Sequence, residues 1–190
     1  MNSINILIVG VGGQGTLLAS KLMGKIFIDA GMDVKVSEVH GMSQRGGSVV
    51  TYVRAGEKVF SPVIDKGEAD VMISFEALES ARWLPYLKKD GVVISNTAQI
   101  DPMPVIMGNA KYPEAVLDLI REKGIKVVSA DALTLAEQAG SAKAVNIVLL
   151  GIAAKQLGLD KETCIEAIRA TVPQKTIEIN EKAFYAGYDL

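Results

Sequence analysis

The feature that most constrains the fold lies at the start of the chain, where a short apolar run passes directly into a glycine-rich turn. Residues 4–9 read Ile-Asn-Ile-Leu-Ile-Val, a nearly continuous apolar segment typical of a strand in the middle of a parallel sheet. Residues 10–15 then read Gly-Val-Gly-Gly-Gln-Gly, and apolar residues recur at helical spacing from Thr16 to Ala30. This order of strand, turn and helix predicts the first unit of an α/β fold.

The alternation continues along the chain, so the local expectations can be stated segment by segment. Strands are expected at residues 34–39, 69–74, 92–95 and 125–129, and helices at residues 76–87, 132–139, 143–156, 161–171 and 174–186. Less regular segments predict a hairpin of 49–54 with 59–60 turning at Gly56, a turn at 88–91, a short strand at 105–106 and a helix from Pro113 to Lys123.

These segments together predict a Rossmann-like α/β fold. An open, mainly parallel sheet carries helices on both of its faces, and the portion after Asp131 is helical. The helix at 143–156 is apolar almost all round, which is typical of a helix buried on several sides. We expect one domain over residues 1–190, because no repeat, linker or low-complexity tract interrupts the pattern.

Composition and charge exclude several classes of protein. Hydrophobic residues make up 49% of the chain, and 20 basic residues against 22 acidic ones give a net charge of −2, so nucleic acid is not an expected partner. One cysteine (Cys164) and one histidine (His40) exclude an internal disulfide, an iron–sulfur cluster and a Cys/His zinc site, and Cys164 is expected to be an inert buried thiol. The first apolar run has no basic region before it and no segment is long enough to span a bilayer, so the expected location is cytoplasmic, away from membranes.

The first glycine-rich loop is a candidate ligand site. Its pattern is G-x-G-x-x-G between a strand and a helix, where glycines allow close backbone approach and the helix N-terminus offers free amides to a phosphate. Glu38, at the end of the next strand, stands near the position where dinucleotide-binding domains hold ribose hydroxyls. The alternative is that the glycines only allow strand, turn and helix to pack closely. The candidate residues are Gly10, Gly12, Gly13, Gln14, Gly15 and Thr16.

A second polar, glycine-rich loop follows the second strand, at residues 40–48. Both loops are expected at the carboxyl edge of the sheet, where ligands bind in open α/β folds. Arg45 beside two glycines suits a phosphate or carboxylate, or it pairs with a carboxylate of another subunit. No nucleophile elbow or catalytic triad is present, so no catalytic residue is predicted. With one cysteine and one histidine, no metal ligand is predicted either. The candidate binding residues here are His40, Ser43, Gln44, Arg45, Gly46 and Gly47.

Taken together, the two loops resemble the gamma-type domain of 2-oxoacid:ferredoxin oxidoreductases. The resemblance rests on residues 12–15 and 38–48 and continues through residues 146–151, 172–173, Asn180, 183–184 and Gly187, in the same order along nearly the whole chain. A chain of this length is most similar to the small (beta) subunit of indolepyruvate:ferredoxin oxidoreductases. The gamma subunits of the pyruvate and 2-oxoglutarate enzymes are close rivals.

This resemblance implies a division of labour between subunits. The complex would decarboxylate a 2-oxoacid on thiamine diphosphate, pass electrons through [4Fe–4S] clusters to ferredoxin and release an acyl-CoA. A large alpha subunit would hold the thiamine diphosphate, Mg and clusters, and this chain would be an accessory subunit holding no cofactor of its own. Its loops would contact coenzyme A or the thiamine intermediate, or form only an interface. Without the resemblance, a stand-alone nucleotide-binding module is the alternative.

Overall fold

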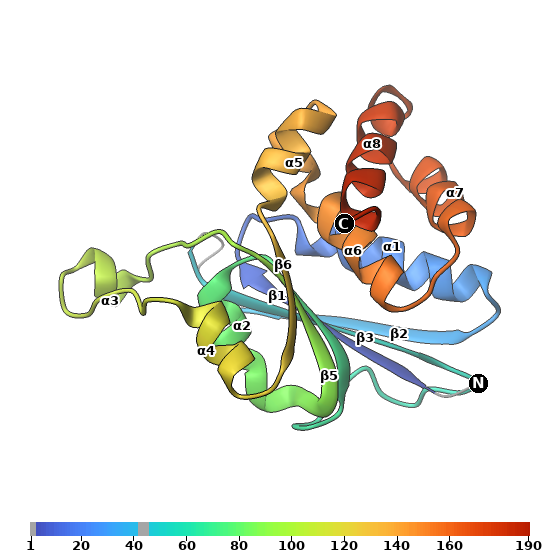
Figure 1. The fold of residues 1–190 in the computed structure, drawn as a ribbon. Helices are drawn as coiled ribbons and strands as arrows, with labels where there is room; N and C mark the ends of the chain where they lie inside the picture. The colour runs from blue at the N-terminus through green and yellow to red at the C-terminus, as the bar shows by residue number, and fades with distance from the viewer. Residues whose placement is uncertain (1–2, 42–45) are drawn as a thin grey trace.

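A computed structural model describes residues 3–41 and 46–190 of the chain. Its strands form one six-stranded sheet in the order β2-β3-β1-β4-β5-β6 (Figure 1). β1 pairs in parallel with β4, β4 with β5 and β5 with β6, whereas β3 runs antiparallel to both of its neighbours, β1 and β2. The predicted open, mainly parallel sheet is therefore confirmed. The strands are β1 (Ile4–Val11), β2 (Asp33–His40), β3 (Ser48–Gly56), β4 (Ala69–Ser74), β5 (Leu87–Asn96) and β6 (Lys126–Ala130).

Helices cover both faces of this sheet, as the alternation of segments predicts. The side chains of β1 divide between the two faces: Ile6 and Ile8 pack with the helices of one layer, and Leu7 and Val9 with the other. The larger layer holds α1 (Thr16–Asp29), α5 (Ala132–Ala139), α6 (Val145–Gln156), α7 (Lys161–Thr171) and α8 (Ile177–Tyr188), and the opposite layer holds α2 (Ala77–Trp83) and α4 (Val116–Glu122) (Figure 1). Single 3₁₀ turns lie at Leu84–Tyr86, Ala142–Ala144 and Gln174–Thr176.

Helix α6 is the centre of the larger layer and is buried from Asn146 to Ala154, as its apolar sequence predicts. It packs against α8 at backbone distance, because both helices carry glycine at the contact. A Cβ atom added to Gly151 would lie 2.2 Å from the carbonyl oxygen of Phe184, and one added to Gly187 would lie 2.0 Å from that of Val148. Although α6 is apolar, it has only 12 residues. In the described part of the chain, no helix has both the length and the apolar character needed to cross a membrane.

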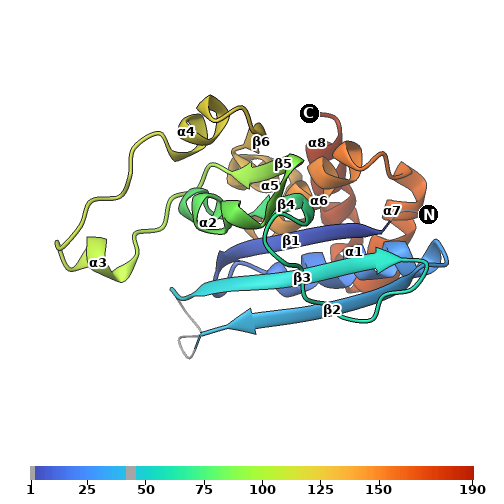
Figure 2. The ribbon, with the colours of Figure 1, turned by 90° about the horizontal axis from the view of Figure 1, so that it is seen from below.

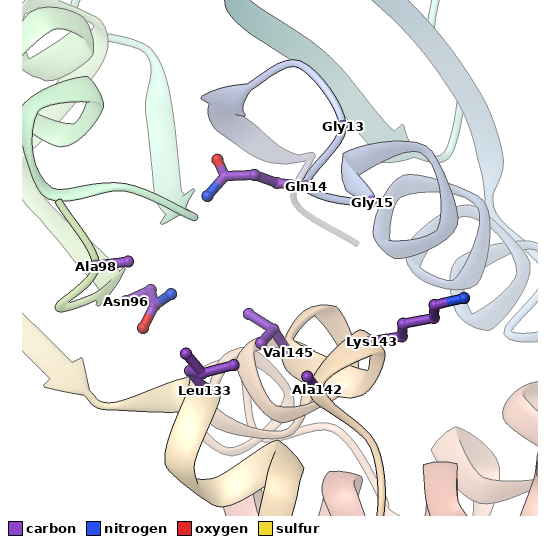
Figure 3. Close-up of a pocket in the computed structure, with 9 residues that line it drawn as sticks. All are labelled: Gly13, Gln14, Gly15, Asn96, Ala98, Leu133, Ala142, Lys143 and Val145. Carbon is purple, nitrogen blue, oxygen red and sulfur yellow. The ribbon is translucent and has the colours of Figure 1, made fainter. Parts of the chain in front are cut away.

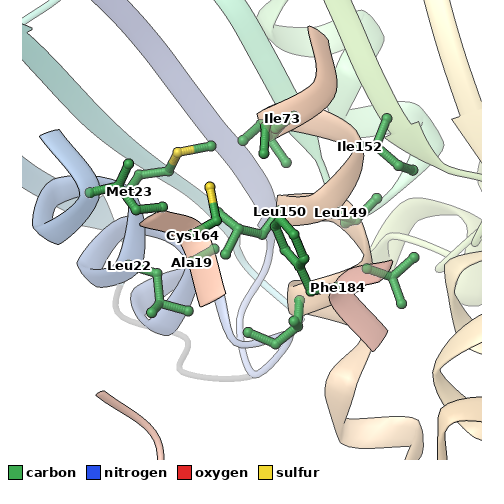
Figure 4. Close-up of a cluster of buried hydrophobic side chains, with 14 of the residues drawn as sticks. Ala19, Leu22, Met23, Ile73, Leu149, Leu150, Ile152, Cys164 and Phe184 are labelled. Carbon is green, nitrogen blue, oxygen red and sulfur yellow. The ribbon is translucent and has the colours of Figure 1, made fainter. Parts of the chain in front are cut away.

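The thiol of Cys164 on α7 lies inside this same core (Figure 4). The side chain is fully buried, and desolvation raises the pKa of the thiol to about 11. The expectation that Cys164 is buried is therefore confirmed, and low reactivity stays a prediction, because the thiolate is the nucleophilic form.

Two of the predicted turns are wrong, and both errors concern β-strands. The predicted hairpin at Gly56 does not form: β3 instead fills the space between β2 and β1, and the following segment folds over the start of β2, where the Val59 N–H donates to Asp33 Oδ2 (2.8 Å). Residues 88–91, predicted as a turn, belong to β5. Their polar sequence reflects a shift in register against β4 and an ion pair between Lys88 and Asp70.

The segment between β5 and β6 also differs from prediction. Residues 105–106, predicted as a strand, lie in the short helix α3 (Met103–Ile106), whose first turn accommodates proline. The helix predicted to begin at Pro113 begins only at Val116, because the backbone passes through a left-handed conformation at Ala115 (φ 51°). Figure 2 shows this segment projecting from the body of the molecule, with α3 at its far end.

Candidate functional site

The two glycine-rich loops meet at one edge of the sheet, as predicted. β1 and β2 each run antiparallel to β3, so their carboxyl ends lie at the same edge, Val11 opposite Ser48 and His40 opposite Val49. A backbone hydrogen bond joins the loops directly: the N–H of Gly12 donates to the carbonyl oxygen of Gly47 (2.9 Å). The residues Ser43, Gln44 and Arg45 of the second loop lie outside the described part of the chain.

The first loop ends by exposing the amino terminus of α1. Gly13 and Gly15 adopt left-handed conformations (φ 96° and 87°), which glycine favours, and Gly15 caps the helix without any side-chain hydrogen bond. Within residues 3–41 and 46–190, no oxygen accepts a hydrogen bond from the N–H groups of Gly15, Thr16 or Leu17. These amides and the positive end of the helix dipole therefore form a surface that attracts anions.

Two residues of the same loop shape it from within. The side-chain oxygen of Gln14 accepts from the Val11 N–H (2.7 Å), and its nitrogen donates to the carbonyl oxygen of Phe75 (3.1 Å). A Cβ atom on Gly10 would lie 2.8 Å from that same Gln14 oxygen and 3.0 Å from Phe75 Cβ, so a larger residue there would displace the Gln14 side chain. For Gly10 and the Gln14 side chain, the packing interpretation is the one that the contacts favour. At Gly13, by contrast, an added Cβ would meet no atom within 4 Å.

A cavity of about 520 Å³ opens on one side of the loop and is called the Lys143 cavity here. Lys143, which precedes α6, supplies the one charged side chain among the described residues that line it, and Figure 3 shows the segment carrying Lys143 on the opposite side of the cavity from the loop. Because a lysine and the start of α1 line the same cavity, its electrostatics favour an anion. The lining residues are Gly13, Gln14, Gly15, Asn96, Ala98, Leu133, Ala142, Lys143 and Val145.

A second cavity of about 390 Å³, the Glu38 cavity, opens on the other side of the loop. Glu38 Oε2 accepts from the hydroxyls of Thr51 (3.0 Å) and Thr16 (3.4 Å), so the carboxylate is fixed between β2, β3 and the start of α1. The exposed ring of His40 also lines this cavity, with Nδ1 3.0 Å from the Gly41 carbonyl oxygen. A carboxylate here favours hydroxyl or N–H donors and disfavours a phosphate.

Asn146 braces the loop from behind. Its side-chain nitrogen donates to the carbonyl oxygen of Gly15 (3.3 Å), while its side-chain oxygen has no partner among the described residues, although only 5% of Asn146 is exposed. A Cβ on Gly15 would lie 3.1 Å from the same nitrogen. The start of α6 thus holds the start of α1, across 131 positions of sequence.

The sequence analysis did not identify Lys143, Asn96 or Asn146 as site residues. No motif marks Lys143 or Asn96, because they line the cavity beside the loop only through the packing of β5 and α6. Asn146 did carry a signal, because it is a polar residue within the apolar run of α6. Gly46 and Gly47 lie as predicted beside the first loop, and Gly46 lines a cavity of about 130 Å³ with Ser48, Glu79 and Arg82.

The residues of this chain do not fit an iron–sulfur cluster. Such a cluster needs several thiolates, and the one cysteine lies in the core behind α1. In the portions of the chain that are described, no three His, Cys, Asp or Glu side chains gather in a way that could hold a metal ion. What the edge offers instead is one cavity lined by a lysine and another lined by a glutamate, on either side of a loop whose amides at the start of α1 have no acceptor among the described residues.

The chain is similar to known proteins along almost its full length. Residues 5–190 match the family described as pyruvate ferredoxin/flavodoxin oxidoreductase. Indolepyruvate oxidoreductase subunit IorB of Thermococcus kodakarensis is 45% identical and the match covers 98% of this chain and 95% of the relative. Ketoisovalerate oxidoreductase subunit VorA of Methanothermobacter marburgensis is 28% identical, and there the match covers 98% of this chain but 36% of the relative.

Solved structures share the fold. Pyruvate oxidoreductase subunit PORC of Thermotoga maritima superimposes with a TM-score of 0.75 at 22% identity, covering 100% of this chain and 97% of that one. The 2-oxoglutarate:ferredoxin oxidoreductase of Magnetococcus marinus, solved with 2-oxoglutarate, coenzyme A and succinyl-CoA bound, gives a TM-score of 0.74 at 18% identity, covering 100% of this chain and 32% of that one. The solved structures show that the fold is shared, and the family match shows that the sequence is related. The chain belongs to the pyruvate ferredoxin/flavodoxin oxidoreductase family.

Proposed function

We propose that this chain is the small accessory subunit of an indolepyruvate:ferredoxin oxidoreductase and that its glycine-rich edge receives coenzyme A. The reaction is supported by the family and by the 45% identity to an indolepyruvate oxidoreductase subunit. The observation that supports coenzyme A as the ligand is the Lys143 cavity, which is lined by a lysine and by the loop at the amino terminus of α1, whose amides have no acceptor among the described residues.

Coenzyme A has the chemistry that this edge would recognise. Its diphosphate is suited to the amides of Gly15 and Thr16 with Lys143 beside them, because charge-assisted hydrogen bonds from backbone and ammonium stabilise phosphate oxygens. Its ribose and amide groups carry O–H and N–H donors, which the Glu38 carboxylate accepts. We assign the anionic part of the ligand to the Lys143 cavity and a neutral part to the Glu38 cavity. Ser43, Gln44, Arg45 and His40 remain candidate polar contacts.

The chemistry of decarboxylation and electron transfer belongs, in this proposal, to a larger alpha subunit. That subunit would hold thiamine diphosphate, Mg and the [4Fe–4S] clusters and deliver electrons to ferredoxin in the cytoplasm. Thiamine diphosphate would supply carbanion stabilisation there. This chain would bind and orient the thiol-bearing substrate and exclude water at the edge of the sheet, without a catalytic residue of its own.

Calorimetric titration of the purified chain with coenzyme A tests the ligand. Lys143→Ala should weaken binding about tenfold, the loss of one charge-assisted contact. Lys155→Ala is the matched control: Lys155 is an exposed lysine near the other end of α6, and its loss should leave the affinity unchanged. Equal affinities for wild type and Lys143→Ala would refute this assignment. Micromolar binding of NADH in place of coenzyme A would favour a stand-alone nucleotide-binding module.

A further inference from the structure

Residues 99–112 form an arm that leaves the sheet after β5 and returns before α4 (Figure 2). Both ends of the arm are bonded to one carboxylate. Glu76, the N-cap of α2, is 1% exposed; its Oε1 accepts from the N–H of Ile100 (3.1 Å) and from the hydroxyl of Tyr112. The Tyr112 hydroxyl in turn accepts from the Leu78 N–H (3.0 Å). The base of the arm is therefore closed by a buried hydrogen-bond network.

The far end of the arm is also ordered by its own hydrogen bonds. The carbonyl oxygen of Pro104 accepts from the N–H groups of Asn109 (2.8 Å) and Ala110 (3.1 Å), which folds the chain back after α3. Gly108, with φ 76°, makes the reversal. The arm is thus anchored to α2 at its base and folded back by its own backbone hydrogen bonds at its far end.

Three large apolar side chains are displayed at this end, and together they are called the tip. Met103 is 62% exposed, Ile106 66% and Met107 65%. None of the three belongs to the two apolar clusters that pack on the faces of the sheet. Grouped exposed apolar side chains mark contact surfaces, and methionine adapts its shape to an apolar partner.

The position of the arm restricts what can cover the tip. Next to its base, Ile100, Asp101 and Pro102 line the cavity that also contains Val11 and Gly46 of the two glycine-rich loops. A partner that closes over the glycine-rich edge of the sheet, called the ligand edge here, therefore lies beside the arm. This argument rests on the proposed function, which requires such a partner to bring its thiamine diphosphate to that edge.

The relatives also indicate that a larger partner chain covers the tip. In the Methanothermobacter marburgensis subunit and the Magnetococcus marinus enzyme, the matched region is 36% and 32% of a longer chain, so the remainder is covalently attached to it. The Thermococcus kodakarensis relative is named a subunit and the match covers 95% of it, so a partner of such a chain must be held by surface contacts. We propose that the tip of the arm docks into an apolar pocket of the large subunit and holds the two chains together at the ligand edge.

The test is the affinity of the purified large subunit for variants of this chain, measured by biolayer interferometry. The triple variant Met103→Ser, Ile106→Ser, Met107→Ser should weaken binding about 100-fold, as expected when a central apolar anchor is removed. The matched control is Ile28→Ser, Val63→Ser, Leu119→Ser, which removes three apolar side chains of similar exposure elsewhere on the surface (58%, 50% and 50%). The control should bind like wild type.

Two further readouts separate the possible results. Coenzyme A titration of the isolated triple variant should give the wild-type affinity; if neither chain binds coenzyme A, the ligand assignment fails while the docking result still stands on its own. Wild-type affinity of the triple variant for the large subunit would overturn the docking proposal. Sedimentation that shows a wild-type dimer and a monomeric triple variant would also overturn it, because the tip would then bind a second copy of this chain.

Discussion

Replacing Gly151 with alanine tests whether the contact between α6 and α8 determines the stability of the molecule. In most helices this change is stabilising by roughly 1 kcal/mol, because alanine has the higher helix propensity. Here the added Cβ would lie 2.2 Å from the Phe184 carbonyl oxygen and 2.8 Å from the Tyr188 nitrogen. Both neighbours are backbone atoms, so no rotation of a side chain relieves the overlap.

The two helices must therefore separate by about 1 Å, which opens gaps along an interface that is otherwise closely packed. Overpacking in a core commonly costs about 1–3 kcal/mol, and the cost is highest where the obstacle is backbone. After subtracting the gain in helix propensity, we expect Gly151→Ala to lower the free energy of unfolding by about 2 kcal/mol or more.

Urea denaturation followed by circular dichroism measures the effect, and Gly24→Ala is the matched control. Gly24 also lies within a helix, but an added Cβ would meet Val36 Cγ2 at 3.6 Å, an ordinary van der Waals contact. That variant should be stabilised by about 0.5–1 kcal/mol, mainly through helix propensity. If Gly151→Ala were as stable as wild type, the backbone contact between α6 and α8 would not be as close as described.

Three other predictions follow from single contacts. Cys164 should resist a thiol reagent at pH 8 in the folded protein and react in urea, since burial raises its pKa to about 11; fast labelling of the folded protein would contradict this. Hydrogen bonds from Thr163 lower the pKa of Asp160 below 3.8, so its contribution to stability is complete above that pH and is lost as the pH falls further. Asp160→Asn should therefore flatten the acid side of a profile of unfolding free energy against pH. An unchanged slope would refute this role of Asp160. Tyr112→Phe should accelerate amide exchange in residues 99–112, because the base of the arm loses its bond to Glu76, whereas unchanged exchange would show that Ile100 alone holds it.

Local signals were sufficient to predict the centre of the fold. β1, the first glycine-rich loop and α1 follow directly from an apolar run, a glycine pattern and helical spacing, and the buried α6 follows from its uniform apolar sequence. The errors arise where a segment is stabilised by distant partners. Lys88 belongs to a strand because Asp70 and the β4 ladder are beside it, and residues 99–112 form an arm because Glu76 closes their base.

The candidate site was predictable in part for the same reason. The loop that exposes the amides of α1 was visible as a motif, as was the meeting of the two loops at one edge. Lys143 was not, since nothing near it in the sequence indicates that it lines the same cavity as Gly13. For Gln14, the motif gave the right location, whereas its hydrogen bonds show that its side chain serves the loop itself.

The hydrogen bond from Asn146 to Gly15 has a consequence for the order in which the molecule is made. During translation the glycine-rich loop emerges first, but the residue that braces it is synthesised 131 positions later. α6 in turn packs closely against Gly187 of α8, which is synthesised later still. A nascent chain arrested before α8 should therefore carry a complete β1, while the contact that positions α6, and through it the brace on the first glycine-rich loop, is still missing.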